Sequence, residues 1–151
     1  MKAIICYLSY SGNTEEIAEL LREHLYARDY EVEMRLVDSE ADSNFSGCDL
    51  LFIGTFTWDM GSVPEEMKYY IQTIMDKPEN TYIFGSGDTQ FGGDILFCRA
   101  VDEVRSYLEC EFPGLKIEQS PRGSQERYVK EWLEGVINYA ESKNLRTEKS
   151  E

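Results

Sequence analysis

Apolar positions along this chain form continuous runs in some segments and spaced stripes in others. Residues 2–8 and 50–54 are nearly continuous apolar runs, which are typical of strands buried on both faces. Residues 82–84 are a shorter run of the same kind, and Leu115, Lys116 and Ile117 predict a weak last strand. In residues 31–36, apolar and charged side chains alternate, which predicts a strand at the edge of a sheet with one face in water. The pattern therefore predicts five strands.

Four further segments carry apolar residues at helical spacing. Their stripes are Thr14, Ile17, Ala18, Leu21 and Leu25; Met67, Ile71 and Ile74; Phe97, Val101, Val104 and Leu108; and Val129, Trp132, Leu133, Val136, Ile137 and Ala140. Asn13 and Pro64 are favourable residues near the starts of the first two helices. The order of elements is β-α-β-β-α-β-α-β-α, with an irregular connection over residues 38–48.

This alternation predicts an α/β fold in which helices cover both faces of a parallel sheet. Because the second strand has the edge pattern and crossovers are right-handed, we predict a doubly wound five-stranded parallel sheet of order 2-1-3-4-5. A length of 151 residues, 42% of them apolar, suits one domain. We place this domain at residues 1–145 and expect residues 146–151 to form a disordered polar tail.

The charge balance narrows the classes of partner. Acidic residues outnumber basic residues by 29 to 15, which gives a formal net charge of −14. This excess opposes binding to nucleic acid or to an anionic membrane surface, and it leaves cations and basic proteins as partners, or simple solubility. No apolar run approaches the ~20 residues of a membrane span, and no signal-peptide pattern is present. We therefore expect a cytoplasmic protein.

The cysteines and the histidine form no recognisable metal or catalytic pattern. Cys6, Cys48, Cys98 and Cys110 include no Cys-x-x-Cys pair, which favours free thiols. The only histidine is His24, which lies within a helical stripe. We therefore expect neither a metal site nor catalytic residues.

Polar loops follow the first, third and fourth predicted strands, so their residues should meet at one edge of the sheet. The first loop consists of Ser9, Tyr10, Ser11, Gly12, Asn13 and Thr14. It contains hydroxyls, an amide and a helix start but no Lys or Arg, so a phosphate could be held there by neutral donors and the helix dipole. The loop lacks Gly-Lys-Ser/Thr, which opposes NTP hydrolysis. An ordinary capped turn is the alternative.

The other two loops carry aromatic residues and glycines. Trp58 follows a strand and belongs to no apolar stripe, so it suits stacking on a flat ligand as well as core packing. Residues 85–94 contain four glycines, which allow close approach of the backbone to a ligand, and Phe91 is a second candidate ring. Together the three loops predict a site for a flat, aromatic ligand with one phosphate.

The sequence resembles the short-chain flavodoxins in four stretches. The matching stretches are Ser-Tyr-Ser-Gly-Asn-Thr-Glu at 9–15, Gly-Thr-Phe-Thr-Trp at 54–58, Gly-Ser-Gly-Asp-Thr at 85–89 and Phe-Cys-Arg-Ala-Val-Asp at 97–102. The resemblance implies a flavodoxin-like three-layer sandwich, one non-covalently bound FMN, and low-potential electron transport between redox proteins. The implied partners are a donor resembling NADPH-dependent flavodoxin reductase and basic acceptor proteins, and we expect a monomer without substrate turnover of its own.

The resemblance also implies a role for each loop. Ser9 to Thr14 would hold the FMN phosphate, and Thr55, Phe56 and Thr57 would line the ribityl side. Trp58 would stack on the inner face of the flavin and Phe91 on the outer face. Ser86, Gly87 and Asp88 would face the pyrimidine edge, with Cys98 packed nearby. The other candidates, in the second loop, are Asp59, Met60 and Gly61.

Two departures from the family pattern lie in these loops. Many relatives carry Gly after the loop Trp, whereas this chain has Asp59, which adopts positive φ less readily than Gly. The third loop is also longer than usual by Gly92, Gly93 and Asp94. Carboxylates of Asp59, Asp88, Glu65 and Asp94 around a flavin, with no Lys or Arg nearby, would disfavour the anionic reduced flavin and predict a strongly reducing potential.

Two other functions remain open from the sequence. Gly61-Ser62-Val63-Pro64 and Gly123-Ser124-Gln125 resemble segments of the flavodoxin-like activators of manganese ribonucleotide reductases. Trp58 and the stretch at 97–102 favour the ordinary flavodoxins instead. The second possibility is a flavodoxin fold that has lost FMN and serves as a binding module.

Overall fold

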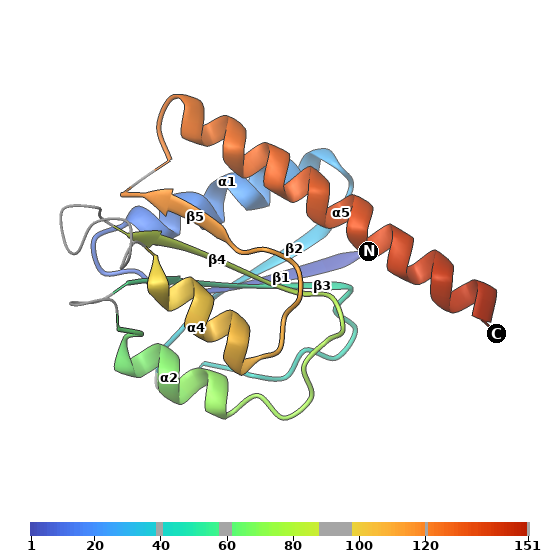
Figure 1. Cartoon of the computed structure of the whole chain (residues 1–151), viewed down its shortest axis with the longest axis horizontal. Helices are drawn as coiled ribbons and strands as arrows, with labels where there is room; N and C mark the ends of the chain where they lie inside the picture. Colours follow the sequence, from blue (N-terminus) through green and yellow to red (C-terminus); the bar gives the residue numbers. More distant parts are fainter. Residues whose placement is uncertain (39–40, 58–61, 88–97, 120, 151) are drawn as a thin grey trace.

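A computed structural model describes residues 1–38, 41–57, 62–87, 98–119 and 121–150 of the chain (Figure 1). Its five parallel strands form one sheet in the order β2-β1-β3-β4-β5, which confirms the predicted order 2-1-3-4-5. The strands are β1 (Lys2–Tyr7), β2 (Glu31–Leu36), β3 (Leu50–Phe56), β4 (Thr81–Gly87) and β5 (Leu115–Glu118). The edge pattern of β2 and the continuous apolar runs of β1 and β3 therefore identified the edge and the centre of the sheet correctly.

Helices cover both faces of this sheet and complete a three-layer sandwich. They are α1 (Asn13–Ala27), α2 (Glu65–Gln72), α4 (Arg99–Tyr107) and α5 (Ser124–Ser150). Figure 1 shows α1 and α5 on one side of the sheet and α2 and α4 on the other. Each pair encloses its own apolar core, one with Leu21 and Leu133 and the other with Met67 and Val104. None of the helices in the described ranges combines the length and the apolar character that a membrane span requires.

Helix α2 is shorter than the sequence pattern indicated. It ends at Gln72, although Ile74 continues its apolar stripe. The N–H of Thr73 bonds to Tyr70 O at 2.9 Å and the N–H of Ile74 bonds to Ile71 O at 3.3 Å, so the helix closes in a tighter turn of i→i−3 bonds. Ile74 nevertheless packs against the core beneath α2, so its apolar character is used outside the helix.

Helix α5 is longer than expected at its C-terminal end. It extends to Ser150, so residues 146–150, which we expected to be a disordered tail, continue the helix. Figure 1 shows this end of α5 reaching beyond the sheet. Arg146, Glu148 and Lys149 all have good helix propensity, which is consistent with continuation of the helix.

The register of the parallel strands brings the ends of β1, β3 and β4 to one edge of the sheet. Tyr7 pairs with Gly54, Gly54 pairs with Phe84, and Phe56 pairs with Ser86. The loops that follow these strands therefore start side by side, at the edge where doubly wound sheets bind ligands.

Candidate functional site

The candidate site consists of the described parts of three loops. Six of the predicted site residues, Trp58, Asp59, Met60, Gly61, Asp88 and Phe91, lie outside the described residues. The described candidates are those of the β1–α1 loop, the end of β3, the end of β4, and Cys98.

The β1–α1 loop opens the N-terminus of α1 at the carboxyl edge of the sheet. Gly12 precedes the helix with φ 93°, a left-handed conformation that favours glycine, and a Cβ there would have open space around it. The Gly12 N–H donates to Ser9 Oγ at 3.1 Å, and the first helical bond runs from Glu16 N to Gly12 O at 3.0 Å. The N–H groups of Asn13, Thr14 and Glu15 therefore have no acceptor within the helix and can serve a bound anion.

The side chain of Tyr10 connects this loop to β3 and α2. Its ring centroid lies 4.9 Å from that of Phe56, and its hydroxyl donates a hydrogen bond to Glu66 in the first turn of α2. This bond lowers the pKa of the Glu66 carboxyl and raises the pKa of the Tyr10 phenol, because it favours the carboxylate and the neutral phenol. Sequence reasoning missed Glu66, and only its place in the first turn of the helix after the second loop hinted at it.

A buried pair of hydroxyls links the first loop to β4. Thr14 Oγ1 lies 2.9 Å from Ser86 Oγ, and the two residues are only 1% and 3% exposed. The carbonyl oxygen of Ser86 also accepts a hydrogen bond of 3.1 Å from the N–H of Thr57. The described residues of all three loops therefore meet at one place, although their pairing was not foreseen from the sequence.

The end of β3 is tied to helix α4 as well. The N–H of Ala100, in the first turn of α4, donates to Thr57 Oγ1 at 3.2 Å. Thr55 is fully buried, and its hydroxyl donates to the carbonyl oxygen of Phe56 at 3.1 Å. Thr57 thus fixes the start of the second loop against both β4 and α4.

Cys98 lies behind β4, inside the core. It has no exposed surface, and its thiol donates weak hydrogen bonds to Gly85 O at 3.8 Å and Ile117 O at 3.7 Å. Burial raises the pKa of this thiol to about 12. Cys98 therefore packs beneath the neighbouring strand ends and supports them from within the core.

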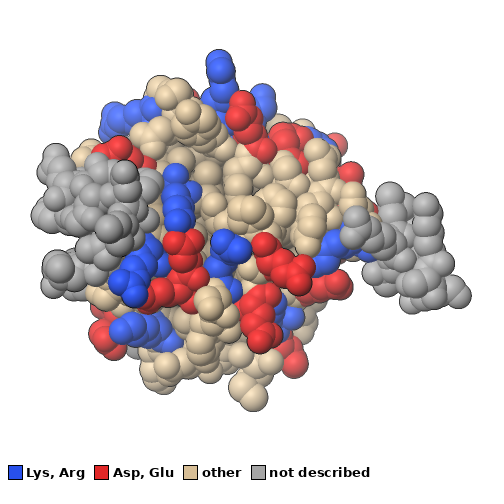
Figure 2. Space-filling model, viewed as in Figure 1, with Lys and Arg blue, Asp and Glu red and all other residues tan. Residues whose placement is uncertain are grey.

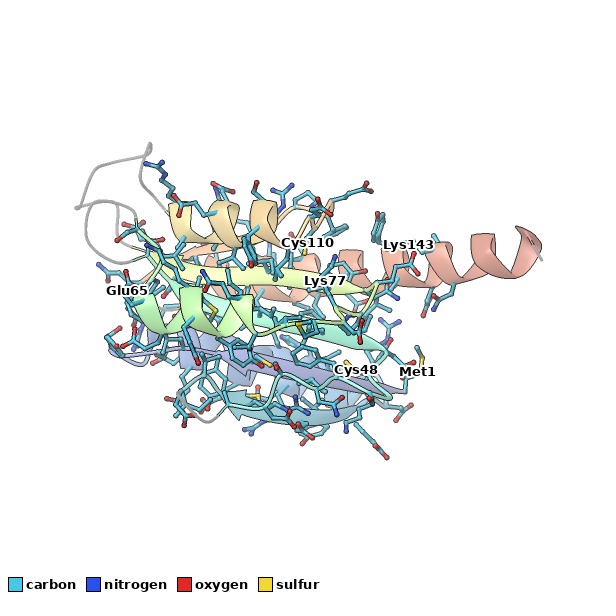
Figure 3. The ribbon with its side chains drawn as sticks, turned by 90° about the horizontal axis from the view of Figure 1, so that it is seen from below. Met1, Cys48, Glu65, Lys77, Cys110 and Lys143 are labelled. Carbon is cyan, nitrogen blue, oxygen red and sulfur yellow. The ribbon has the colours of Figure 1, made fainter. Side chains whose placement is uncertain are left out.

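The donors at this edge are neutral, but charges of both signs lie near them, contrary to the expectation that no Lys or Arg would be nearby. Arg122 lies 4.0 Å from Glu16 in the first turn of α1, and Arg99 at the start of α4 lies 3.1 Å from Glu103. The segments 9–14, 55–57 and 86–87 contain no Lys or Arg. Glu65, at the start of α2, lies at the same end of the molecule, whereas Lys77 and Lys143 lie toward the opposite end (Figure 3). Hydroxyls, an amide and a helix N-terminus can hold one phosphate group without a cation, and this donor set fits a phosphomonoester.

Comparisons with known proteins agree with this geometry. The flavodoxin family model matches residues 5–132. Probable flavodoxin 2 of Bacillus subtilis is 31% identical over 137 residues, which cover 83% of this chain and 87% of that protein. Probable flavodoxin 1 of the same organism is 28% identical, with 95% and 94% covered. The solved structure of oxidised flavodoxin 2 from Bacillus cereus has a TM-score of 0.79 and 30% identity, covering 92% of this chain and 99% of that one.

Proposed function

This chain belongs to the flavodoxin family, whose members carry electrons on bound FMN, and we propose that the three loops described above hold that FMN. The observation that carries the proposal is the open N-terminus of α1 beside the joined ends of β3 and β4. It offers neutral donors for one phosphate next to strand ends that can receive a flat ring system.

The phosphate end of FMN would lie at the start of α1. Ser9, Ser11 and Asn13 would supply side-chain donors there, and the first-turn N–H groups would supply main-chain donors. The exposed side chain of Tyr10 is engaged with Phe56 and Glu66, so this residue would contribute chiefly by holding the loop in place.

The ring end would lie beyond β3 and β4. The described part of the surface that would contact the ring consists of residues 55–57 and 86–87. By resemblance to the family, Trp58 and Phe91 would stack on the two faces of the flavin, and Asp59, Met60, Gly61 and Asp88 would line its edges. Cys98 would pack beneath this surface, within the core.

The flavin supplies the redox chemistry, and the chain's own residues position it and set its electrostatic surroundings. We propose that electrons pass from an NADPH-dependent reductase to basic acceptor proteins, without substrate turnover by this chain itself. The net charge of −14 supports basic partners. A cytoplasmic monomer is part of the same proposal, and four free cysteines suit a reducing compartment.

A role as an activator of manganese ribonucleotide reductases is not favoured. The matched family model and the named relatives are flavodoxins. The sequence segments that resembled such activators, around Val63 and Gly123, are short.

Flavin content tests the proposal directly. Purified chain should be yellow, and its heat-released flavin should be identified as FMN in a ratio of one per chain. The loaded protein should then be reduced by an NADPH-dependent flavodoxin reductase and reoxidised by a basic cytochrome. A colourless chain that, after refolding with FMN, still shows no quenching of FMN fluorescence would overturn the proposal.

A further inference from the structure

Ser86 occupies the junction between the phosphate end and the ring end of the proposed FMN site. Its side chain meets Thr14, 72 positions away in the sequence, and its main chain meets Thr57. Thr14 belongs to the first turn of α1, and Gly87 directly follows Ser86 at the end of β4. One buried side chain therefore connects the helix turn that faces the phosphate with the strand that leads to the flavin edge.

We infer that Ser86 is a positioning residue which, through its hydrogen bond to Thr14, sets the spacing between the phosphate subsite and the ring subsite. The inference rests on the FMN site proposed above and adds to it the residue that couples its two ends. Ser86 is 3% exposed and its hydroxyl is directed to Thr14, so its effect on the ligand is transmitted through Thr14 and through the start of the third loop.

The physical consequence is selective for ligands that fill both subsites. A ligand with a ring and a phosphate gains most when the two subsites are already held at the right separation, because no ordering cost is then incurred on binding. Riboflavin, which lacks the phosphate group, would occupy the ring subsite alone, and inorganic phosphate would occupy the helix N-terminus alone. Loss of the Ser86–Thr14 bond should therefore weaken FMN binding and leave the binding of these two smaller ligands nearly unchanged.

The test measures competition between FMN and riboflavin for the full-length chain. In Ser86→Ala, the preference for FMN over riboflavin should fall by about five- to tenfold, the size expected from one hydrogen bond. Binding of inorganic phosphate to the flavin-free chain should change by less than about twofold on the same reasoning. Thr14→Val, which removes the other hydroxyl while keeping the side-chain shape, should reduce the preference for FMN by the same factor.

A double variant separates positioning from stability. Ser86→Ala leaves the Thr14 hydroxyl buried without its partner, whereas Ser86→Ala with Thr14→Val removes both polar groups, so the double variant should be the more stable of the two. Its preference for FMN should nevertheless remain as low as in either single variant. Recovery of the FMN preference together with stability would overturn the inference.

Thr81 provides the matched control. It lies at the other end of β4, is 4% exposed, and donates a hydrogen bond of 2.6 Å to Pro78 O. Thr81→Val should leave the preference for FMN unchanged. A wild-type chain that binds no FMN would overturn the proposed function and this inference with it. A wild-type chain that binds FMN, beside a Ser86→Ala chain with an unchanged preference, would overturn the role of Ser86 alone.

Discussion

The ring of Phe84 in β4 lies directly against Gly54 in β3. A Cβ built at Gly54 would stand 2.1 Å from the Cζ atom of that ring, far inside van der Waals contact. The two residues are paired in register at the centre of the sheet, and both are buried. A glycine is therefore required at position 54 by the close approach of its neighbour.

Gly54→Ala should lower the free energy of unfolding by about 1–3 kcal/mol, because the ring must move within a packed core. Urea unfolding of the flavin-free chain measures this change. Gly135→Ala is the matched control, since a Cβ there would lie 3.6 Å from Phe112 Cζ, an ordinary contact. In the middle of α5 this second change should stabilise the protein by up to ~1 kcal/mol. Equal stabilities of the two variants would contradict the prediction.

The sequence predicted the strand order well because a strand at the centre of the sheet is continuously apolar, whereas the edge strand β2 carries charged residues. The continuous run at 50–54 and the alternation at 31–36 indicated the central and edge positions that the structure confirms for β3 and β2. It predicted helix ends less well, because α2 closes in a tight turn in which the N–H groups of Thr73 and Ile74 bond three residues back, and the spacing of apolar residues does not indicate such a turn.

The convergence of the described loop segments could also be predicted, but the contacts between them could not. The spacing of loops after strands indicated which segments converge. The Thr14–Ser86 bond and the Tyr10–Glu66 bond depend on side-chain directions that only the folded chain fixes. Both residues of the first pair were expected to face the ligand, yet their hydroxyls face each other beneath the loops.

Tyr10→Phe should raise the pKa of Glu66 toward the ordinary value of a glutamate, because it removes the hydrogen bond that favours the carboxylate. The lowered pKa of Glu66 means that this bond stabilises the fold above the carboxyl's unfolded pKa and is lost as the pH falls through the folded pKa. The raised pKa of Tyr10 means that the bond is also lost at high pH, as the phenol ionises.

A carbon-13 NMR titration of the Glu66 carboxyl measures this change. Tyr26→Phe, which alters another exposed tyrosine at the far end of α1, is the control and should leave the titration of Glu66 where it is. The same midpoint for Glu66 in wild type and Tyr10→Phe would refute the hydrogen bond.

The four thiols should react at very different rates in the native protein. Burial raises the pKa of Cys6 to about 11 and that of Cys98 to about 12, so both thiols stay protonated in the native protein near neutral pH. Cys48 is half-buried and should react first with a disulfide reagent such as Ellman's reagent, before the buried Cys110. Cys6 and Cys98 should react only on unfolding.

The number of thiols that have reacted with the reagent, followed over time with and without denaturant, checks this order. Cys48→Ser serves as the comparison, because it should abolish the first reaction and leave the slow ones unaltered. Fast labelling of Cys98 in the folded protein, located by peptide mass, would show that the strand end above it opens readily and would contradict its assigned place in the core.

The second one-electron step of the loaded protein should have a potential well below that of free FMN. Segments 9–14, 55–57 and 86–87 contain no Lys or Arg. The described basic residues near this edge are each paired with a carboxylate, so they offer little compensation for an additional negative charge there; the pairs are Lys68–Glu65, Arg99–Glu103 and Arg122–Glu16. Spectroelectrochemical titration measures the potential. A value close to that of free FMN would rule out this electrostatic contribution.

Association with a basic acceptor should slow as the salt concentration rises, because the net charge of −14 attracts a cationic partner over a screened distance of about 10 Å at 0.1 M salt. On the face seen in Figure 2, basic and acidic side chains are interspersed, so this face shows no single acidic patch. Within this overall attraction, we expect carboxylates near the site end to contribute more than distant ones, because the partner must approach that end to receive an electron.

Two matched charge changes distinguish these possibilities. Glu65 Oε1 lies 3.6 Å from Lys68 Nζ, and Glu79 Oε1 lies 3.6 Å from Lys143 Nζ. Glu65→Gln and Glu79→Gln therefore each remove one exposed carboxylate that is paired with a lysine. Lys143, the partner of Glu79, lies toward the opposite end of the molecule from Glu65 (Figure 3). Stopped-flow electron transfer to a basic cytochrome at low salt should be slower for Glu65→Gln than for Glu79→Gln, and the difference should disappear at high salt. Equal rates for both variants at low salt would mean that only the overall charge attracts the partner.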